Sequence, residues 1–290
     1  NVLDNGKISL VEGSVDIGGS RTAVSQQLAE VLGIPVMDVI PQVADTDTIG
    51  YTSNTGGSGV AYKSGWAAHD AANDIKDQLI KRASMIWEVP SKDIAYVDGA
   101  LQHNSDPELR MTFKEIAAIL PDTGGPVVGR ANINPGGLHG SYAANIVDVE
   151  VDPETGKVDI LRYTAFQDAG KAIHPSYVEG QIQGGTTQGI GWALNEEYFM
   201  SSDGRMLNTS FLDYRMPTSY DVPMIEPVIV EVPSAMHPFG VRGVGEANIV
   251  PPPAAIANAI HNATGIRMRN LPMSPGSILK TIQESNSDIR

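Results

Sequence analysis

One predicted helix contains more glycine than helix propensity alone would allow. The segment from about Ser176 to Glu197 begins just after a proline and is helical in pattern. Its interior glycines are Gly180, Gly184, Gly185, Gly189 and Gly191. Each of them costs roughly 1 kcal/mol relative to alanine. Because glycine has no side chain, such a helix suits a place where another backbone or a ligand must approach closely. We therefore expect a chain segment or a bound molecule to lie against this helix.

A second glycine-rich stretch runs from His237 to Glu246. It places three glycines and Arg242 just before a single carboxylate, and residues 254–260 then read as a helix. Glycine permits the positive φ angles that aim a side chain at the end of a tight turn. On this pattern alone Glu246 has two interpretations. It is either an acid that favours the start of the next helix or a carboxylate held for chemistry.

Composition excludes several classes of function. The chain has 290 residues, 41% of them hydrophobic and 19% charged, with a formal net charge of -14. This balance argues against nucleic acid or an anionic membrane as the main partner, because such surfaces need clustered Lys and Arg. There is no cysteine, so this chain supplies no disulfide, thiolate zinc site or iron–sulfur ligand. Its six histidines lack metal-binding spacing, and we assign no metal ligand from the protein.

Targeting signals are not apparent in the sequence. No run reaches the roughly 18–20 apolar residues of a membrane span. The N-terminus has no starting Met and no signal-peptide layout. We expect a cytoplasmic protein that is a processed product, a fragment or one piece of a larger unit.

The periodicity predicts an α+β fold made of two units. Alternation over residues 7–15, a glycine turn, a helix over 23–32 and a strand over 36–43 form the first elements. A long helix is expected over 60–88, and Thr112 with Glu115 forms a capping box. Later, Asp152–Gly156 is a hairpin turn, and 204–214 is expected to be another hairpin arm. The Pro- and Gly-rich stretch over 121–140 is the best internal boundary. We predict two two-layer α/β sandwich units with mixed sheets, residues 1–135 and 136–290, whose glycine-rich turns grip a cofactor between them.

Three segments combine glycines with hydroxyl side chains: Gly18–Thr22, Thr55–Ser58 and Gly184–Gln188. Exposed backbone N–H groups and hydroxyls at a helix N-terminus bind phosphate. None is a phosphate-loop or dinucleotide-binding motif, and each alone is more often a structural turn. Together they indicate a polyanionic ligand held by backbone in an acidic protein, such as a large phosphorylated cofactor.

Several blocks in a fixed order resemble one known family. They are Asp152–Gly156, Asp168-x-Gly170 with His174-Pro175, Gly180–Glu197, Asp213–Thr218, Gly243–Glu246 and the tail from Asn258 to Pro275. The chain is similar to the C-terminal half of the molybdenum-binding subunit of the xanthine dehydrogenase/aldehyde oxidase family. We expect either a fragment or the smaller molybdenum subunit of a split enzyme, as in nicotinate-dehydrogenase-like enzymes.

The resemblance implies a role for particular residues. Glu246 matches the catalytic base beside molybdenum, with Gly245 next to it on the cofactor. Gln188 matches a glutamine near a molybdenum oxygen. The pterin side of the cofactor is matched by Gly56, Gly57 and Ser58. The cofactor's pyrophosphate and nucleotide are matched by Gly18, Gly19, Ser20, Arg21 and Thr22. Gly18-Gly19-Ser20 departs from the family's common Gly-Gln-Gly, and Arg242 stands where lysine is frequent.

The implied activity is the oxidative hydroxylation of an electron-poor carbon, with water as oxygen source. The implied cofactor is molybdopterin cytosine dinucleotide with molybdenum in sulfido or selenido form. A buried base of this kind is expected to have a raised pKa. The implied partners are a second molybdopterin-binding subunit, an iron–sulfur (2Fe-2S) subunit and an FAD subunit, with no nucleic acid and no membrane.

Alternatives remain at this stage. We expect an aromatic N-heterocycle as substrate, by analogy with split enzymes. Aldehyde or purine oxidation by the same chemistry is the alternative, as is a cofactor-binding scaffold subunit without catalysis. A nucleotide-binding transferase is disfavoured, because the chain has neither a phosphate-loop lysine nor paired carboxylates for a metal.

Overall fold

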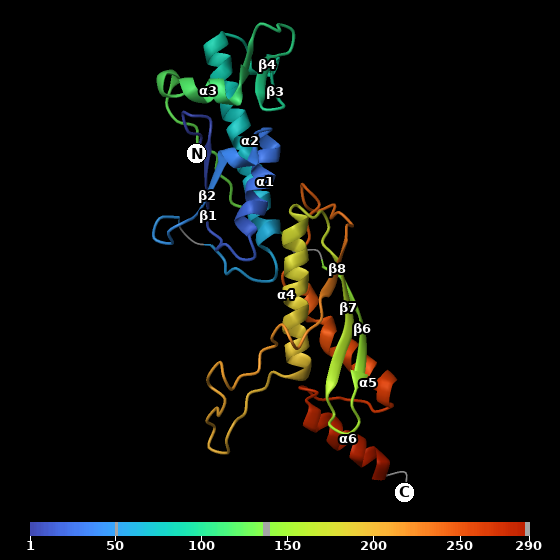
Figure 1. Ribbon diagram of the computed structural model, residues 1–290. Coiled ribbons are helices and arrows are strands. Elements are labelled where there is room, and N and C mark those ends of the chain that lie inside the picture. The colour runs from blue at the N-terminus through green and yellow to red at the C-terminus, as the bar shows by residue number, and fades with distance from the viewer. Residues whose placement is uncertain (50–51, 136–139, 288–290) are drawn as a thin grey trace. The chain divides into compact units, whose positions relative to one another are not determined.

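A computed structural model describes residues 1–49, 52–135 and 140–287. The chain divides into two compact units (Figure 1). The first comprises Asn1–His139 and Pro233–Gly243, and the second comprises Gly140–Val232 and Val244–Arg290. Residues 233–243, which the sequence division placed in the second unit, thus belong to the first by their contacts.

The first unit contains two small sheets and three α-helices within its described residues. Its elements are β1 (Ile8–Glu12), α1 (Ser20–Leu32), β2 (Val39–Val43), α2 (Val60–Trp87), β3 (Ile94–Val97), β4 (Ala100–His103), β5 (Arg110–Thr112) and α3 (Phe113–Ile119), with 3-10 turns η1 (Val36–Asp38), η2 (Ser91–Asp93) and η3 (Pro121–Thr123). Strands β1 and β2 pair in parallel, whereas β3, β4 and β5 form an antiparallel sheet in that order. Helix α1 lies alongside α2 (Figure 1).

Local sequence explains how these elements begin and pack. The capping box at α3 is present, with the Thr112 hydroxyl accepting from the Glu115 amide and the Glu115 carboxylate accepting from the Thr112 amide. Helix α1 ends at Gly33, which adopts a left-handed conformation. Gly65 lets α1 and α2 approach each other, because a Cβ there would lie 2.1 Å from the Gln27 amide nitrogen. Gln27 uses that nitrogen to bind the Ala61 carbonyl on α2, which fixes the register of the two helices.

The second unit has one mixed sheet covered by helices. Its elements are β6 (Ala143–Val151), β7 (Val158–Asp168), α4 (Pro175–Leu194), β8 (Ile225–Val230), the 3-10 turn η4 (Ala247–Ile249), α5 (Pro251–Thr264) and α6 (Pro275–Ser287). The Asp152–Gly156 turn joins β6 and β7 as the predicted antiparallel hairpin, and β8 pairs with β7 in parallel. Helices α4 and α5 pack on each other and share a core with β7, built on Tyr163, Ile182 and Ile256.

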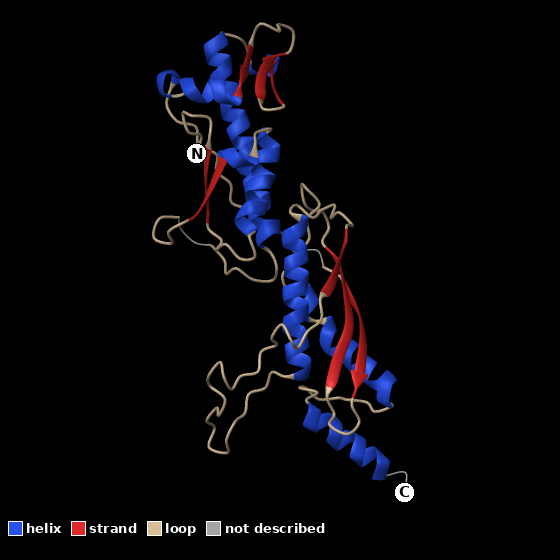
Figure 2. Cartoon of the chain, in the orientation of Figure 1, coloured by secondary structure: helices blue, strands red, loops and turns tan. Residues whose placement is uncertain are grey.

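The predicted hairpin arm over 204–214 was wrong. Residues 198–224 contain no named strand, and Figure 2 shows a long loop between α4 and β8. One isolated antiparallel bridge within it joins Met200 and Met206. Local polar contacts hold this loop instead. Asn208, for example, accepts from the Phe199 amide and donates to the Glu197 carbonyl. We call residues 198–224 the arm.

The mixed α/β architecture with several small sheets is confirmed. Of the three sheets in the described residues, only β6–β7–β8 combines parallel and antiparallel pairing. Across the same residues, no helix combines the length and apolar character that crossing a membrane requires.

Candidate active site

Glu246 lies at the first turn of the second unit's C-terminal segment. It is the residue before η4, it is exposed, and its side chain makes no capping hydrogen bond to that turn. The neighbouring Gly245 is exposed as well. The interpretation of Glu246 as a helix-capping acid therefore lacks the hydrogen bond that defines a cap. The carboxylate lies at the surface of this chain rather than in a dry pocket that the chain builds alone.

The glycines of α4 bring the segment after Glu246 close to that helix. A Cβ at Gly189 would lie 2.8 Å from the Ile249 carbonyl oxygen and 2.5 Å from Pro252 Cγ. At Gly185 the nearest atoms belong to Asn248 and Ile249, at 3.5 Å. Close approach of another backbone was one of the two reasons expected for these glycines. It holds at Gly189, whereas a Cβ at Gly185 would make only ordinary van der Waals contact. This contact fixes the position of η4 along the α4 axis.

The opposite face of α4 is open. Gly180, Gly184, Gln188 and Trp192 recur every four residues and are all exposed, and a Cβ at either of these glycines would meet nothing within 4 Å. Packing within the chain therefore gives no reason for Gly180 or Gly184. Half of the Trp192 surface is exposed on this face. Gln188 lies on this open face, where its amide can donate to a bound group.

The turn before α1 is partly satisfied by its own side chains. Gly18 and Gly19 have φ angles of 60° and 78°, the left-handed region that favours glycine. The Arg21 amide donates to Asp16 at 3.0 Å, and the Arg21 guanidinium pairs with the same carboxylate at 2.8 Å. The amide bond first, and then the side chain, lowers the pKa of Asp16. The Arg21 charge is thus largely compensated within the turn, and the Ser20 hydroxyl accepts from the Ile17 amide.

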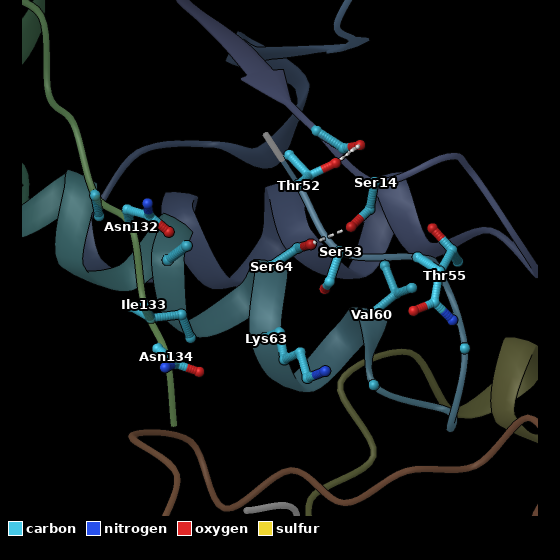
Figure 3. Close-up of a pocket in the computed structure, with 16 residues that line it drawn as sticks. Ser14, Thr52, Ser53, Thr55, Val60, Lys63, Ser64, Asn132, Ile133 and Asn134 are labelled. Atoms are coloured by element: carbon cyan, nitrogen blue, oxygen red, sulfur yellow. Dashed lines mark hydrogen bonds between the residues drawn. The ribbon is translucent and has the colours of Figure 1, made fainter. Parts of the chain in front are cut away.

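The loop before α2 forms one wall of a pocket in the first unit. Gly57 and Ser58 both have positive φ, 64° and 57°, and Gly57 is exposed with open space beside it. The pocket has a volume of about 420 Å³ and is bounded by residues 13–14, 52–56, 59–60, 63–64, 67 and 131–134 (Figure 3). Of the predicted site residues, only Gly56 lines it. The Gly18–Thr22 turn, although in the same unit, does not.

Three polar residues of this pocket were missed in the sequence. Lys63 comes from the first turns of α2, and Asn132 and Asn134 come from the connection after α3 (Figure 3). Two further lining residues, Ser14 and Ser64, are joined by a hydrogen bond of 2.9 Å between their hydroxyls. The Asn132-x-Asn134 pair within a Pro- and Gly-rich connection was the only sequence signal of a polar site here. Because both asparagines are far from Lys63 along the chain, the sequence did not indicate that the three residues line one pocket.

The described lining of the pocket is polar and carries no negative charge. The chain carries a net charge of -14. Nevertheless, no carboxylate lines this pocket, and Lys63 is the one charged side chain among its described lining residues. Serine, threonine and asparagine side chains supply hydrogen-bond donors around it. Such a lining is compatible with an anionic ligand.

His237 has a structural role in the first unit. It is 5% exposed, and its Nε2 lies 3.0 Å from the Tyr62 carbonyl oxygen, while Nδ1 faces the amides of Phe239 and Val241. This network suits a neutral imidazole that donates from Nε2 and accepts at Nδ1, and burial lowers its pKa. The Tyr62 hydroxyl donates in turn to the Met236 carbonyl at 3.2 Å. Residues 233–243 are thereby fastened to α2.

No group of three or more potential metal ligands occurs within the described residues. The predicted site residues fall into two sets. Gly18–Thr22 and Gly56–Ser58 belong to the first unit, whereas Gln188, Gly245 and Glu246 belong to the second.

Small sheets, glycine turns in the left-handed region and a carboxylate beside a glycine-rich helix are compatible with a cofactor-binding protein. A family model described as "Molybdopterin cofactor-binding domain" matches residues 1–223. The chain therefore belongs to the molybdopterin cofactor-binding domain family.

Individual relatives agree with this assignment. The putative xanthine dehydrogenase molybdenum-binding subunit XdhA of Escherichia coli K12 is 32% identical over 278 residues, covering 93% of this chain and 37% of that protein. The nicotine 6-hydroxylase large subunit of Paenarthrobacter nicotinovorans is 33% identical over 291 residues, covering 95% and 35%. Quinoline 2-oxidoreductase from Pseudomonas putida 86 superposes with a TM-score of 0.86 at 29% identity, covering 98% and 37%. The chain spans little more than a third of the length of these relatives.

Proposed function

We propose that this chain is the part of a molybdenum hydroxylase that carries the catalytic base, Glu246. In this proposal the enzyme hydroxylates an electron-poor carbon of an aromatic N-heterocycle, with water as the oxygen source. The observation that carries the proposal is the placement of Glu246. It is exposed, it caps no helix, and it sits on a turn pressed against the glycine-rich α4, in a chain of the molybdopterin-binding family.

Each residue then has a definite task. The Glu246 carboxylate accepts the proton that leaves as the oxygen nucleophile forms, and general bases of this kind contribute about 10²- to 10⁴-fold to rate. The Gln188 amide donates a hydrogen bond without adding charge. When bound, the molybdenum cofactor supplies the acceptor for the two electrons released by the substrate.

Backbone and neutral side chains hold the cofactor's phosphorylated part in this account. The left-handed Gly18 and Gly19 present their amides, and Thr22 presents its hydroxyl, while Ser20 and Arg21 shape the turn. Gly56, Gly57 and Ser58 form the second loop that contacts the cofactor in this proposal. We propose molybdopterin cytosine dinucleotide as the form bound, and Gly245 leaves room for it beside Glu246.

The preference for a heterocycle is supported by the relative named for nicotine 6-hydroxylation and by the quinoline 2-oxidoreductase structure. The relative named for xanthine dehydrogenase keeps purine oxidation as the second candidate. A scaffold without catalysis is disfavoured because this chain contains the carboxylate itself.

We assign the 2Fe-2S and FAD groups, and the second molybdopterin-binding part, to other polypeptides or to other segments of the enzyme. The chain has no cysteine for an iron–sulfur cluster. The arm supports the existence of a covering partner. Its Phe211, Leu212 and Tyr220 side chains are 90%, 94% and 99% exposed, more apolar surface than an isolated protein normally leaves in water.

The test is purification of the enzyme from its natural source, with analysis of bound molybdenum and of the nucleotide released by acid. Molybdenum and cytidine monophosphate in equal amounts per chain support the proposal, as does dye-coupled oxidation of N-heterocycles ahead of aldehydes and purines. Protein that contains neither molybdenum nor a nucleotide would overturn it.

A further inference from the structure

A buried pair of amide side chains brackets Glu246 in the second unit. Gln167, near the end of β7, and Asn248, in η4, both have 0% of their surface exposed. Gln167 Nε2 donates to the Val244 carbonyl oxygen at 3.1 Å, and Asn248 Nδ2 donates to Gln167 Oε1. One side chain of the sheet therefore contacts the residue two before Glu246 and the residue two after it.

This arrangement restrains the backbone on both sides of Glu246. Gly245 lies inside the bracketed stretch and places little restriction on its own φ and ψ. Because Val244 and Asn248 are both held by Gln167, the path of the backbone through Glu246 is restrained at its two ends. The packing of Asn248 and Ile249 against Gly185 and Gly189 sets its height on α4.

The anchor point is itself rigid. Asp168, next to Gln167, is buried and accepts from the Gly170 amide at 2.9 Å and from the Val232 amide at 3.2 Å. These bonds tie the end of β7 to the residues that follow β8. The Gln167 backbone is thus held from both sides while its amide reaches η4.

The chemistry of the pair allows only one kind of side chain at each position. Gln167 must donate to a carbonyl with one atom and accept from an amide with the other, which a carboxylate of the same shape cannot do. Asn248 must donate, because its partner is an oxygen. Unmade hydrogen bonds at such buried positions are costly.

We propose that Gln167 and Asn248 are positioning residues that hold Glu246 in its catalytic orientation. This proposal rests on the proposed function of Glu246 as the base. It predicts that the pair acts on turnover rather than on cofactor or substrate binding, because neither side chain reaches the surface.

The test compares isosteric variants in the complete, molybdenum-loaded enzyme. Gln167→Glu and Asn248→Asp each remove one hydrogen bond without changing shape. We expect kcat to fall about 10- to 100-fold, the size typical when an outer support of a catalytic group is lost. The KM and the molybdenum content should remain near those of the wild type. Hydrogen–deuterium exchange over residues 244–249 should become faster, while exchange in α5 should not change.

Gln183→Glu is the matched control. Gln183 also donates from Nε2 to a backbone carbonyl in the same unit, that of Ile225 at 3.1 Å, which lies outside the bracketed segment. It should leave kcat within about twofold of the wild type and exchange over 244–249 unchanged. If the acidic variants do not fold, Asn248→Ala decides, because it removes the donor without burying a charge.

The outcomes separate this proposal from the function on which it rests. Normal turnover of the Glu246→Gln enzyme would contradict the proposed function, because Glu246 would then not be the base. If Glu246→Gln is inactive while the folded Gln167 and Asn248 variants keep normal kcat and normal exchange, only the positioning role fails. A parallel loss of molybdenum, melting temperature and rate would show a merely structural pair and would also overturn it.

Discussion

Glu12 is a carboxylate that folding has placed among apolar side chains. It lies on the same face of β1 as Ile8 and Leu10, it is 7% exposed, and neither of its oxygens has a hydrogen-bond partner. Burial first, and then the nearby Asp16 charge, raises its pKa to about 7. The side chain therefore binds a proton more tightly in the folded state than in the unfolded state.

This shift has a definite sign for stability. The folded pKa is raised above the unfolded value, so the free energy of unfolding falls as pH rises from about 4.5 to about 7 and is then level. The full penalty is on the order of 3 kcal/mol. Glu12→Gln should be more stable than the wild type at pH 8, by about 1–3 kcal/mol, and about equal to it near pH 4. Denaturant unfolding at both pH values measures this, with the exposed Glu30→Gln as control. An equal effect at both pH values would contradict it.

Lys63 is the residue whose charge sets the character of the first unit's pocket. We predict that Lys63→Gln weakens binding of cytidine monophosphate or pyrophosphate by roughly tenfold, since a charged hydrogen bond contributes on the order of 1.5–3 kcal/mol. Lys81→Gln, an exposed lysine on the same helix, should have no effect. Titration calorimetry at low and high salt measures both. Equal affinities for the two variants would show that the pocket does not bind the phosphates.

At the scale of elements, α4 offers a comparison within one helix. Gly189→Ala should destabilise the fold by a few kcal/mol, because a Cβ there would meet the Ile249 carbonyl and Pro252. Gly180→Ala has open space and should stabilise it by up to about 1 kcal/mol. Melting temperatures from thermal unfolding measure this, and Gly180→Ala should melt above the wild type and Gly189→Ala below it. If Gly189→Ala proves as stable as Gly180→Ala, close approach is not the reason for Gly189.

The same scale shows what the sequence could predict. The Asp152–Gly156 hairpin, the Thr112–Glu115 cap and the extent of α2 depend on neighbours in the chain, and local patterns predicted them. The arm could not be predicted in this way, because turn residues favour a hairpin while pairing depends on partners elsewhere. The polar pocket was also missed. It joins Lys63 to Asn132 and Asn134, some seventy positions away, and periodicity carries no signal for that.

At the scale of the whole molecule, the apolar arm contrasts with a surface of net charge -14. We expect the proposed partner to cover the arm, since Phe211, Leu212 and Tyr220 are almost fully exposed in this chain. Replacing Phe211 and Leu212 together by serine should weaken assembly without unfolding the second unit. Light scattering of the purified complex measures this, with Val15→Ser, a half-exposed residue of the first unit, as control. Unchanged assembly would place the partner elsewhere.

The central claim is that Glu246 is the base of a molybdenum-dependent reaction. The most direct measurement is the turnover rate of the Glu246→Gln enzyme, made beside its molybdenum and nucleotide content and beside Glu154→Gln, an exposed hairpin control. We predict that Glu246→Gln retains molybdenum and nucleotide at wild-type levels and loses at least about 100-fold in kcat, while Glu154→Gln is unaffected. A Glu246→Gln enzyme with full cofactor and a near wild-type rate would contradict the account.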